Sequence, residues 1–251
     1  KKTKIKKSRM GSGSRVLLSL YSSAPFLSLS SAQLRFKPSL AVRVSSHMAH
    51  AASSVSTDNP SASSAIDFLS LCHRLKTTKR AGWLRKDIQE PESIADHMYR
   101  MGLMALIAPD FPGIDRDKCV KMAVVHDIAE AIVGDITPAD GIPKEEKSRR
   151  EQEALDHMCK VLGGGSRAKE VAELWTEYEA NSSPEAKFVK DLDKVEMILQ
   201  ALEYEDEQGK DLDEFFRSTA GKFQTEIGKA WASEIVSRRN KTKDSSHSHS
   251  T

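Results

Sequence analysis

The sequence has few cysteines, no long apolar run and, at its beginning, no acidic residues. The three cysteines, Cys72, Cys119 and Cys159, are far apart and form no C-x-x-C pair, which argues against a disulfide framework or a structural zinc site. No stretch reaches the roughly 18 consecutive apolar residues of a membrane-spanning helix. Neither G-x-x-x-x-G-K-[ST] nor G-x-G-x-x-G occurs. We therefore expect a protein of a reducing compartment, without a membrane span or a glycine-rich phosphate loop.

Acidic residues are missing from positions 1–57, which carry ten of the 38 lysines and arginines. The first acid is Asp58, and the remaining 28 basic and 36 acidic residues give positions 58–251 a formal charge of −8. Surfaces that bind nucleic acids or anionic membranes favour a net basic face. The charge of the foldable part therefore argues against both kinds of partner.

Residues 1–64 are rich in serine and alanine and contain only short apolar patches, such as RVLLSLYSSAPFLSLSS. This composition resembles an organelle transit peptide and lacks the continuous apolar core of a secretory signal. We expect a disordered leader and linker at 1–64 that directs the protein to a plastid or a mitochondrion. A merely disordered extension on a cytoplasmic protein is the alternative.

From Ser64 onward the apolar spacing is helical, and no segment shows sustained strand-like alternation. The expected helices cover 65–78, 92–108, 117–133, 144–162, 167–180, 184–207, 212–216 and 219–238. Ser93 and Asp96 occupy capping-box positions in the second of them, and Gly134 follows the third. The sequence predicts an all-α protein with one helical bundle at 65–238 and a disordered polar tail at 239–251.

Ionisable groups gather in KMAVVHDIAEAIVGDITPAD, residues 121–140, within an otherwise apolar helical run. Glu130 is four residues after His126 and three after Asp127, so the three side chains share one face of the expected helix. Enclosing carboxylates without a counter-charge is costly, so the cluster needs a cation or paired bases. A divalent metal supplies that charge.

Further ligands must come from other helices, because His126 and Asp127 give only one nitrogen and one oxygen. The candidates are His97 in PESIADH and Asp193 in KDLDKVEM. Alone, each has a plainer interpretation, as an ordinary histidine and as part of a solvated salt-bridge ladder. Together, two imidazoles and two carboxylates suit a borderline-to-hard ion such as Mn²⁺, Co²⁺, Mg²⁺, Zn²⁺ or Fe²⁺.

The order His97…His126-Asp127…Asp193 on an all-helical background resembles the HD-domain superfamily of metal-dependent phosphohydrolases. Four blocks are similar to the HD-domain-containing protein 2 group, eukaryotic relatives of the bacterial YfbR-type 5′-deoxynucleotidases: RAGWLR, PESIADHMYRM, VVHDIAEAIVGDITP and KDLDKVEMILQALEYE. The similarity covers about 65–237. It implies an HD-domain bundle, hydrolysis of deoxyribonucleoside 5′-monophosphates to deoxyribonucleoside and phosphate, a small-molecule nucleotide substrate and a homodimer.

Carried over residue by residue, the resemblance assigns a metal to His97, His126, Asp127 and Asp193. It makes Glu130 and Asp135 catalytic, and makes both, with the backbone of Ile136, candidate ligands of a second ion. A divalent metal makes water nucleophilic near neutral pH and offsets the charge of phosphoryl oxygens. Glu130 could then orient or deprotonate that water as general base. For Asp135, a role at a helix end or as an N-cap stays open.

The segment KRAGWLRK offers groups that bind a phosphate monoester. Arg80 provides a planar fork of donors for the phosphate, and Trp83 provides a surface for base or sugar. The bacterial pattern has Arg directly before Trp, where this chain has Gly82, so Arg80 and Arg85 both remain candidates for the phosphate. A basic loop with a buried Trp anchor is the plainer alternative.

Two other functions stay open at this stage. Another HD-type phosphoester hydrolase, such as a guanosine tetraphosphate pyrophosphohydrolase or a nucleotide triphosphohydrolase, usually has extra domains or basic motifs that we do not find here. A non-catalytic metal-binding helical module would not require Glu130 and Asp135.

Overall fold

The computed structural model describes residues 59–248, with side chains up to residue 244. The predicted leader lies outside the described residues as far as residue 58, as do residues 249–251 of the predicted tail. Between 59 and 248 the chain forms helices and no strand, and a single antiparallel bridge joins Lys79 and Ser93. This confirms the all-α prediction. No helix in the described part is long and apolar enough to cross a membrane.

The longer helices of the described part follow the predicted order, but the first begins at Ala62, inside the predicted leader, and the last begins at Glu226 instead of residue 219. The helical elements of this part are α1 (Ala62–Thr77), α2 (Ala81–Leu84), α3 (Ile94–Ile107), α4 (Arg116–Val125), α5 (Glu130–Val133), the 3₁₀ turn η1 (Pro138–Asp140), α6 (Lys144–Val161), α7 (Gly165–Ala180), α8 (Pro184–Gln208), α9 (Asp213–Thr219) and α10 (Glu226–Ser248).

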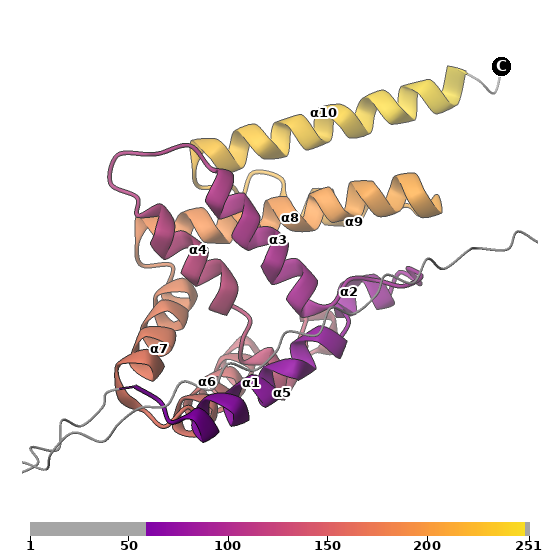
Figure 1. The fold of residues 1–251 in the computed structure, drawn as a ribbon. Coiled ribbons are helices and arrows are strands. Elements are labelled where there is room, and N and C mark those ends of the chain that lie inside the picture. The colour runs from indigo at the N-terminus through magenta and orange to yellow at the C-terminus, as the bar shows by residue number, and fades with distance from the viewer. Residues whose placement is uncertain (1–58, 249–251) are drawn as a thin grey trace, which may run out of the picture. The chain divides into compact units, whose positions relative to one another are not determined.

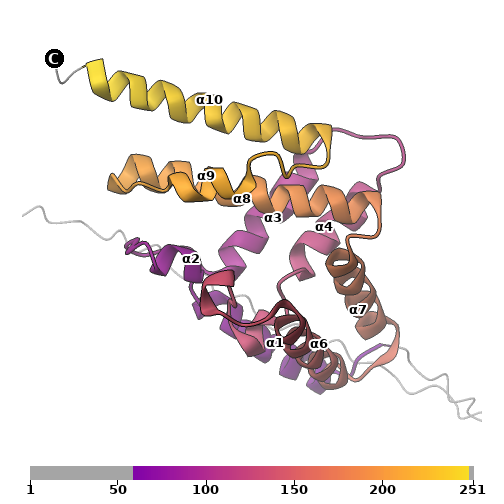
Figure 2. The ribbon, with the colours of Figure 1, turned by 180° about the vertical axis from the view of Figure 1, so that it is seen from behind.

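Helix α8 is the element on which the bundle is built. It packs against α3, α4, α7, α9 and α10, and α10 runs alongside it in both views (Figures 1 and 2). Its apolar positions recur at helical spacing and are buried, namely Phe188, Val189, Leu192, Val195, Ile198 and Leu202. Helices α3 and α4 pack on each other, and α1 packs on α3, α5 and α6. This packing brings the first turns of α3, the end of α4 and the middle of α8 together.

The predicted helix over 117–133 is wrong in its middle. Helix α4 ends at Val125, residues 126–129 form a turn, and α5 begins at Glu130. The N–H of Ile128 donates to the carbonyl of Val125 at 3.0 Å, and that of Glu130 donates to the carbonyl of Asp127 at 3.0 Å. These bonds to the third residue back wind the chain more tightly than an α-helix. Shared helical spacing therefore does not explain why the side chains of His126, Asp127 and Glu130 lie together.

The prediction of a disordered tail from residue 239 is wrong as far as residue 248, because α10 continues to Ser248. Arg239 is buried and donates to Glu205 at 2.6 and 2.7 Å and to Asp213 at 2.8 Å. Its guanidinium lies over the ring of Phe216, 3.9 Å from the centroid. These contacts anchor α10 beyond the predicted end of its apolar pattern.

Candidate active site

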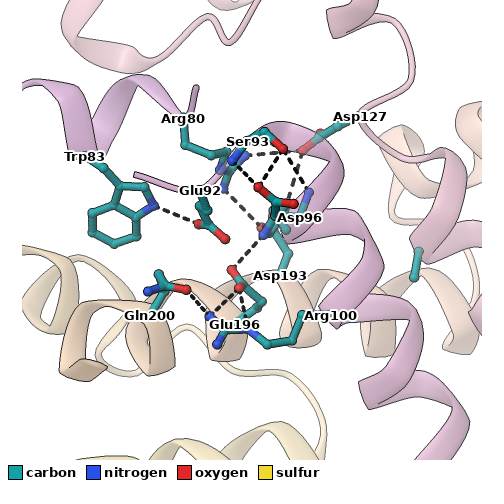
Figure 3. Close-up of polar contacts among 12 residues, drawn as sticks. Arg80, Trp83, Glu92, Ser93, Asp96, Arg100, Asp127, Asp193, Glu196 and Gln200 are labelled. Atoms are coloured by element: carbon teal, nitrogen blue, oxygen red, sulfur yellow. Dashed lines mark hydrogen bonds and ion pairs between the residues drawn. The ribbon is translucent and has the colours of Figure 1, made fainter. Parts of the chain in front are cut away.

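The four predicted metal ligands come together between α3, the end of α4 and α8. His97 follows the Ser93 and Asp96 capping box that starts α3, and His126 is the C-terminal cap of α4. The Nε2 atom of His126 lies 3.1 Å from Oδ2 of Asp127. The Nε2 atom of His97 lies 3.8 Å from that oxygen and 3.3 Å from Oδ1 of Asp193. Figure 3 shows the two aspartates beside Arg80.

The partners of both imidazoles fix which ring nitrogen faces the site. Nδ1 of His97 lies 2.7 Å from Oε2 of Glu196, and Nδ1 of His126 lies 2.9 Å from the carbonyl oxygen of Ala123. Because these oxygens accept, each Nδ1 carries a proton and donates it. The Nε2 atoms are buried and have no hydrogen-bond partner. Two buried nitrogens without partners, facing two carboxylates, fit a divalent cation.

Electrostatics hold the aspartates of the site in their charged form. Burial raises the pKa values of Asp127 and Asp193, but the two imidazoles and the guanidinium of Arg80 outweigh it and bring both well below the usual value. Burial and Arg80 lower the pKa of His97, but Glu196 and Asp193 outweigh them and raise it to about 10. The same carboxylates that favour positive charge on His97 favour a cation at this place.

Glu130 is buried next to the ligands without a compensating partner. Its side chain is 3% exposed, and its Oε2 atom has no hydrogen-bond partner. Burial, followed by the carboxylates of Asp127 and Asp135, raises the pKa of Glu130 well above its usual value. A carboxylate in such surroundings binds protons more readily than an exposed one, as a general base requires.

Asp135 and Ile136 follow Gly134, whose φ of 78° turns the chain sharply after α5. Both line the cavity that contains the ligands. Oδ2 of Asp135 accepts from the backbone N–H of Ala81 at 2.6 Å, at the first residue of α2. The carboxylate thus caps a helix that comes from elsewhere in the chain. It fixes the backbone next to Arg80, and one of its oxygens is already engaged.

Of the two arginines of KRAGWLRK, only Arg80 lies beside the metal ligands. Its Nη1 atom is 3.3 Å from Oδ2 of Asp127 and its Nη2 atom is 4.0 Å from Oδ1 of Asp193. Arg85 instead donates to Thr137 and, at 2.6 Å, to Asp140. Arg85 thus braces η1, and Arg80 is the better candidate for the phosphate.

Trp83 is a buried anchor rather than an exposed stacking surface. It is 2% exposed, and its indole N–H donates to Oε1 of Glu92 at 2.7 Å (Figure 3). Its ring packs on Phe215 at 4.4 Å and on Tyr204 at 5.4 Å between centroids. Trp83 therefore packs behind the wall of the site. The alternative interpretation of this segment, a basic loop with a buried Trp anchor, describes this packing.

A cavity of about 290 Å³, here called the polar cavity, contains most of these groups. His126, Asp127, Glu130, Asp135 and Asp193 line it together with three cationic side chains, those of Arg80 before α2, Lys147 of α6 and Lys190 of α8. Tyr178 closes one side, donating its hydroxyl to Oδ2 of Asp193 at 3.0 Å. The polar cavity thus combines a cation site, an unpartnered carboxylate and positive charge for an anion.

Comparison with known proteins identifies the family of the chain. A family model described as "HD domain" matches residues 72–235, which include every ligand candidate. The chain belongs to the HD-domain family. The human protein named 5′-deoxynucleotidase HDDC2 is 53% identical over 173 residues, covering 68% of this chain and 84% of the human one. The Schizosaccharomyces pombe protein named 5′-deoxynucleotidase hdd1 is 49% identical over 182 residues, covering 70% and 90%.

Solved structures place the same fold in archaea. The PH0347 protein from Pyrococcus horikoshii is 36% identical, with a TM-score of 0.58, and the match covers 70% of this chain and 98% of that protein. The segments that carry His97, His126 and Asp193 lie within the residues matched by the HD-domain model.

Glu196 is a residue of this HD domain that the sequence analysis missed. It is fully buried, one turn beyond Asp193 on α8, and it links His97 to Arg100. The Nε atom of Arg100 donates to Oε1 of Glu196 at 2.8 Å (Figure 3). Arg100 is held in turn by Gln200 and Glu203, at 2.5 and 2.6 Å. The spacing of three in KDLDKVEM was the available signal, since residues three apart share a helix face.

We expect Glu196→Gln to weaken metal binding by about 10-fold to 100-fold, because the carboxylate orients the imidazole of His97 and makes it a stronger metal ligand. Competition with a coloured chelator measures the dissociation constant. Glu203→Gln is the matched control, since Glu203 also pairs with Arg100 but does not touch His97. Equal losses of metal affinity in the two variants would show that Glu196 acts only through its contact with Arg100.

Proposed function

We propose that the chain is a metal-dependent 5′-deoxynucleotidase, which hydrolyses deoxyribonucleoside 5′-monophosphates to deoxyribonucleoside and phosphate. The observation that carries this proposal is the pair of buried Nε2 atoms of His97 and His126, without partners and facing Asp127 and Asp193. The names of the human and fission yeast relatives support the same activity.

We propose Mn²⁺, Co²⁺ or Mg²⁺ as the ion, with Zn²⁺ and Fe²⁺ as the less favoured alternatives. His97, His126, Asp127 and Asp193 would hold it, and two carboxylates suit harder ions than an all-nitrogen or sulfur site does. When bound, the ion supplies Lewis-acid chemistry, acidifying water and offsetting charge on the phosphoryl oxygens. The engagement of Asp135 with Ala81 favours one strongly held ion over two.

The side chains of the polar cavity divide the remaining work. Arg80 presents a planar fork of donors beside the ligands and binds the phosphoryl oxygens. Glu130 takes a proton from the attacking water as the oxygen of that water bonds to phosphorus and the bond from phosphorus to the 5′ oxygen breaks, and that proton then passes to the 5′ oxygen, which leaves as the hydroxyl of the deoxyribonucleoside. Asp135 positions Arg80 through the N–H of Ala81. A non-catalytic metal module would have no use for a buried, unpartnered carboxylate such as Glu130.

A phosphate-release assay tests the proposal. Purified protein is given each deoxyribonucleoside and ribonucleoside 5′-monophosphate with Mn²⁺, Co²⁺, Mg²⁺ or Zn²⁺ in turn, with guanosine tetraphosphate and nucleoside triphosphates as competing substrate classes. We expect release from the deoxyribonucleoside monophosphates and a requirement for added metal. A protein that binds metal and releases no phosphate from any of them would contradict the proposal.

We also propose that the protein is a homodimer. The outer face of α3 carries large apolar side chains that are 40–71% exposed, namely Tyr99, Leu103, Leu106 and Ile107. Leu103 and Ile107 continue into a groove formed with Trp231 and Ile235 of α10. Exposed apolar patches of this kind often mark protein interfaces. Sedimentation of the wild type and of Leu106→Glu tests whether this face joins two copies.

We propose further that the leader at 1–64 directs the protein to a plastid or mitochondrion, on the basis of its composition. Fusion of this segment to a fluorescent protein tests the destination.

A further inference from the structure

A second cavity, of about 430 Å³, adjoins the polar cavity. The two share Arg80, Asp135, Thr137 and Pro138 as lining residues. The second cavity also has apolar walls from Phe215 and Met197, so we call it the aromatic cavity. Its volume is within the range of small-molecule sites. A ligand whose phosphate is bound by Arg80 can therefore extend from one cavity into the other.

We propose that the aromatic cavity binds the base of the nucleotide, with the ring of Phe215 as its principal contact. The inference rests on the proposed function, since it names where the rest of that substrate lies. A nucleobase is planar and largely apolar on its faces, and aromatic side chains stack on any base. Phe215 is only partly buried, whereas Trp83 behind it is 2% exposed. Phe215 is therefore the aromatic side chain that a base can reach.

Gly82 allows Phe215 to take this place. A Cβ atom at position 82 would lie 3.3 Å from Cε1 of Phe215, closer than ordinary van der Waals contact. A side chain at position 82 would therefore require the ring of Phe215, which packs on Trp83 at 4.4 Å between centroids, to shift by a few tenths of an ångström. Gly82, which stands where the bacterial pattern has arginine, thus leaves room for the aromatic wall that Phe215 of α9 forms.

The polar groups around the aromatic cavity are already engaged. Arg85 donates to Thr137 and Asp140. Glu214 pairs with Lys86 at 2.7 Å, and the hydroxyl of Ser218 donates to the carbonyl of Phe215 at 2.7 Å. Groups engaged in this way are poorly placed to read the edge of a base by hydrogen bonds. We therefore expect purine and pyrimidine nucleotides to be accepted alike, held by ring contact.

The test compares nucleotides with 2-deoxyribose 5-phosphate, which keeps the sugar and phosphate and lacks the base. The readout is the ratio of kcat/KM for dAMP, and separately for dCMP, to kcat/KM for the base-free ester. In Phe215→Leu we expect this ratio to fall by about tenfold, mainly through KM, from the lost stacking. Phe216→Leu is the matched control, since Phe216 is buried on the same helix and does not line the cavity.

A second variant guards against a folding defect in the first. Ala139 is exposed on η1 and lines the aromatic cavity from the other side, so Ala139→Phe should fill it and lower the same ratio. Equal losses for nucleotides and the base-free ester, or a wild type that does not prefer nucleotides, would overturn the inference. A wild type that hydrolyses none of these esters with metal bound would instead overturn the proposed function.

Discussion

Glu130→Gln is expected to keep the metal and to lose about 10²-fold to 10⁴-fold in kcat, the usual contribution of a general base. The amide has nearly the same shape as the carboxylate but cannot take a proton from water. Glu130 is buried, and its Oε2 atom has no hydrogen-bond partner. A carboxylate that stabilised the fold would be expected to have such a partner. Loss of the Glu130 carboxylate should therefore leave the fold and the cation site in place.

The measurement combines kcat on a deoxyribonucleoside monophosphate with the metal content of the same sample. Glu179→Gln is the matched control, because Glu179 lines the polar cavity but is exposed. Near-normal turnover in Glu130→Gln would refute the general-base role. Loss of metal together with turnover would make Glu130 a ligand instead.

The helices themselves could be predicted because their signals are local. The buried positions of α8 recur at helical spacing, and the capping box of Ser93 and Asp96 starts α3 as expected. His97 and Asp193 could be named as candidate ligands, but only the resemblance assigned them to one site, since nothing local to His97 connects it with Asp193, 96 positions away in the sequence. Only the packing of α3 on α8 brings the two to 3.3 Å.

Features decided by tertiary contacts could not be predicted in the same way. The turn at 126–129 has an apolar pattern that suits a continuous helix. Its backbone hydrogen bonds to the third residue back cannot be predicted from that pattern. The role of Phe215 depends on its contact with Trp83, 132 residues earlier. Arg239 is in a polar stretch typical of a disordered tail, and its partners Glu205 and Asp213 come from α8 and α9.

Asp193 shows how such long-range contacts create the site, and Asp193→Ala is expected to abolish both metal binding and turnover. Its Oδ1 atom faces Nε2 of His97, and its Oδ2 atom is held by the hydroxyl of Tyr178. Without it the set keeps two imidazoles and one carboxylate, all from α3 and the end of α4, and loses the contribution of α8.

Thermal unfolding separates this effect from a general loss of stability. A ligand that binds only the folded protein stabilises it by about 2.7 kcal/mol at one hundred times its dissociation constant. Mn²⁺ should therefore raise the Tm of the wild type and leave that of Asp193→Ala unchanged. The metal-free Tm of the variant should also fall, because the charges that lower the pKa of Asp193 lose a partner.

The metal-dependent shift in Tm, and not the metal-free Tm, is accordingly the decisive readout. Asp206→Ala is the matched control, since Asp206 is exposed near the end of the same helix and should keep the full shift. A shift of wild-type size in Asp193→Ala would mean that the ion binds without α8. The cation site would then be confined to α3 and the turn after α4, and the polar cavity would lose its role as the place where metal and phosphate are brought together.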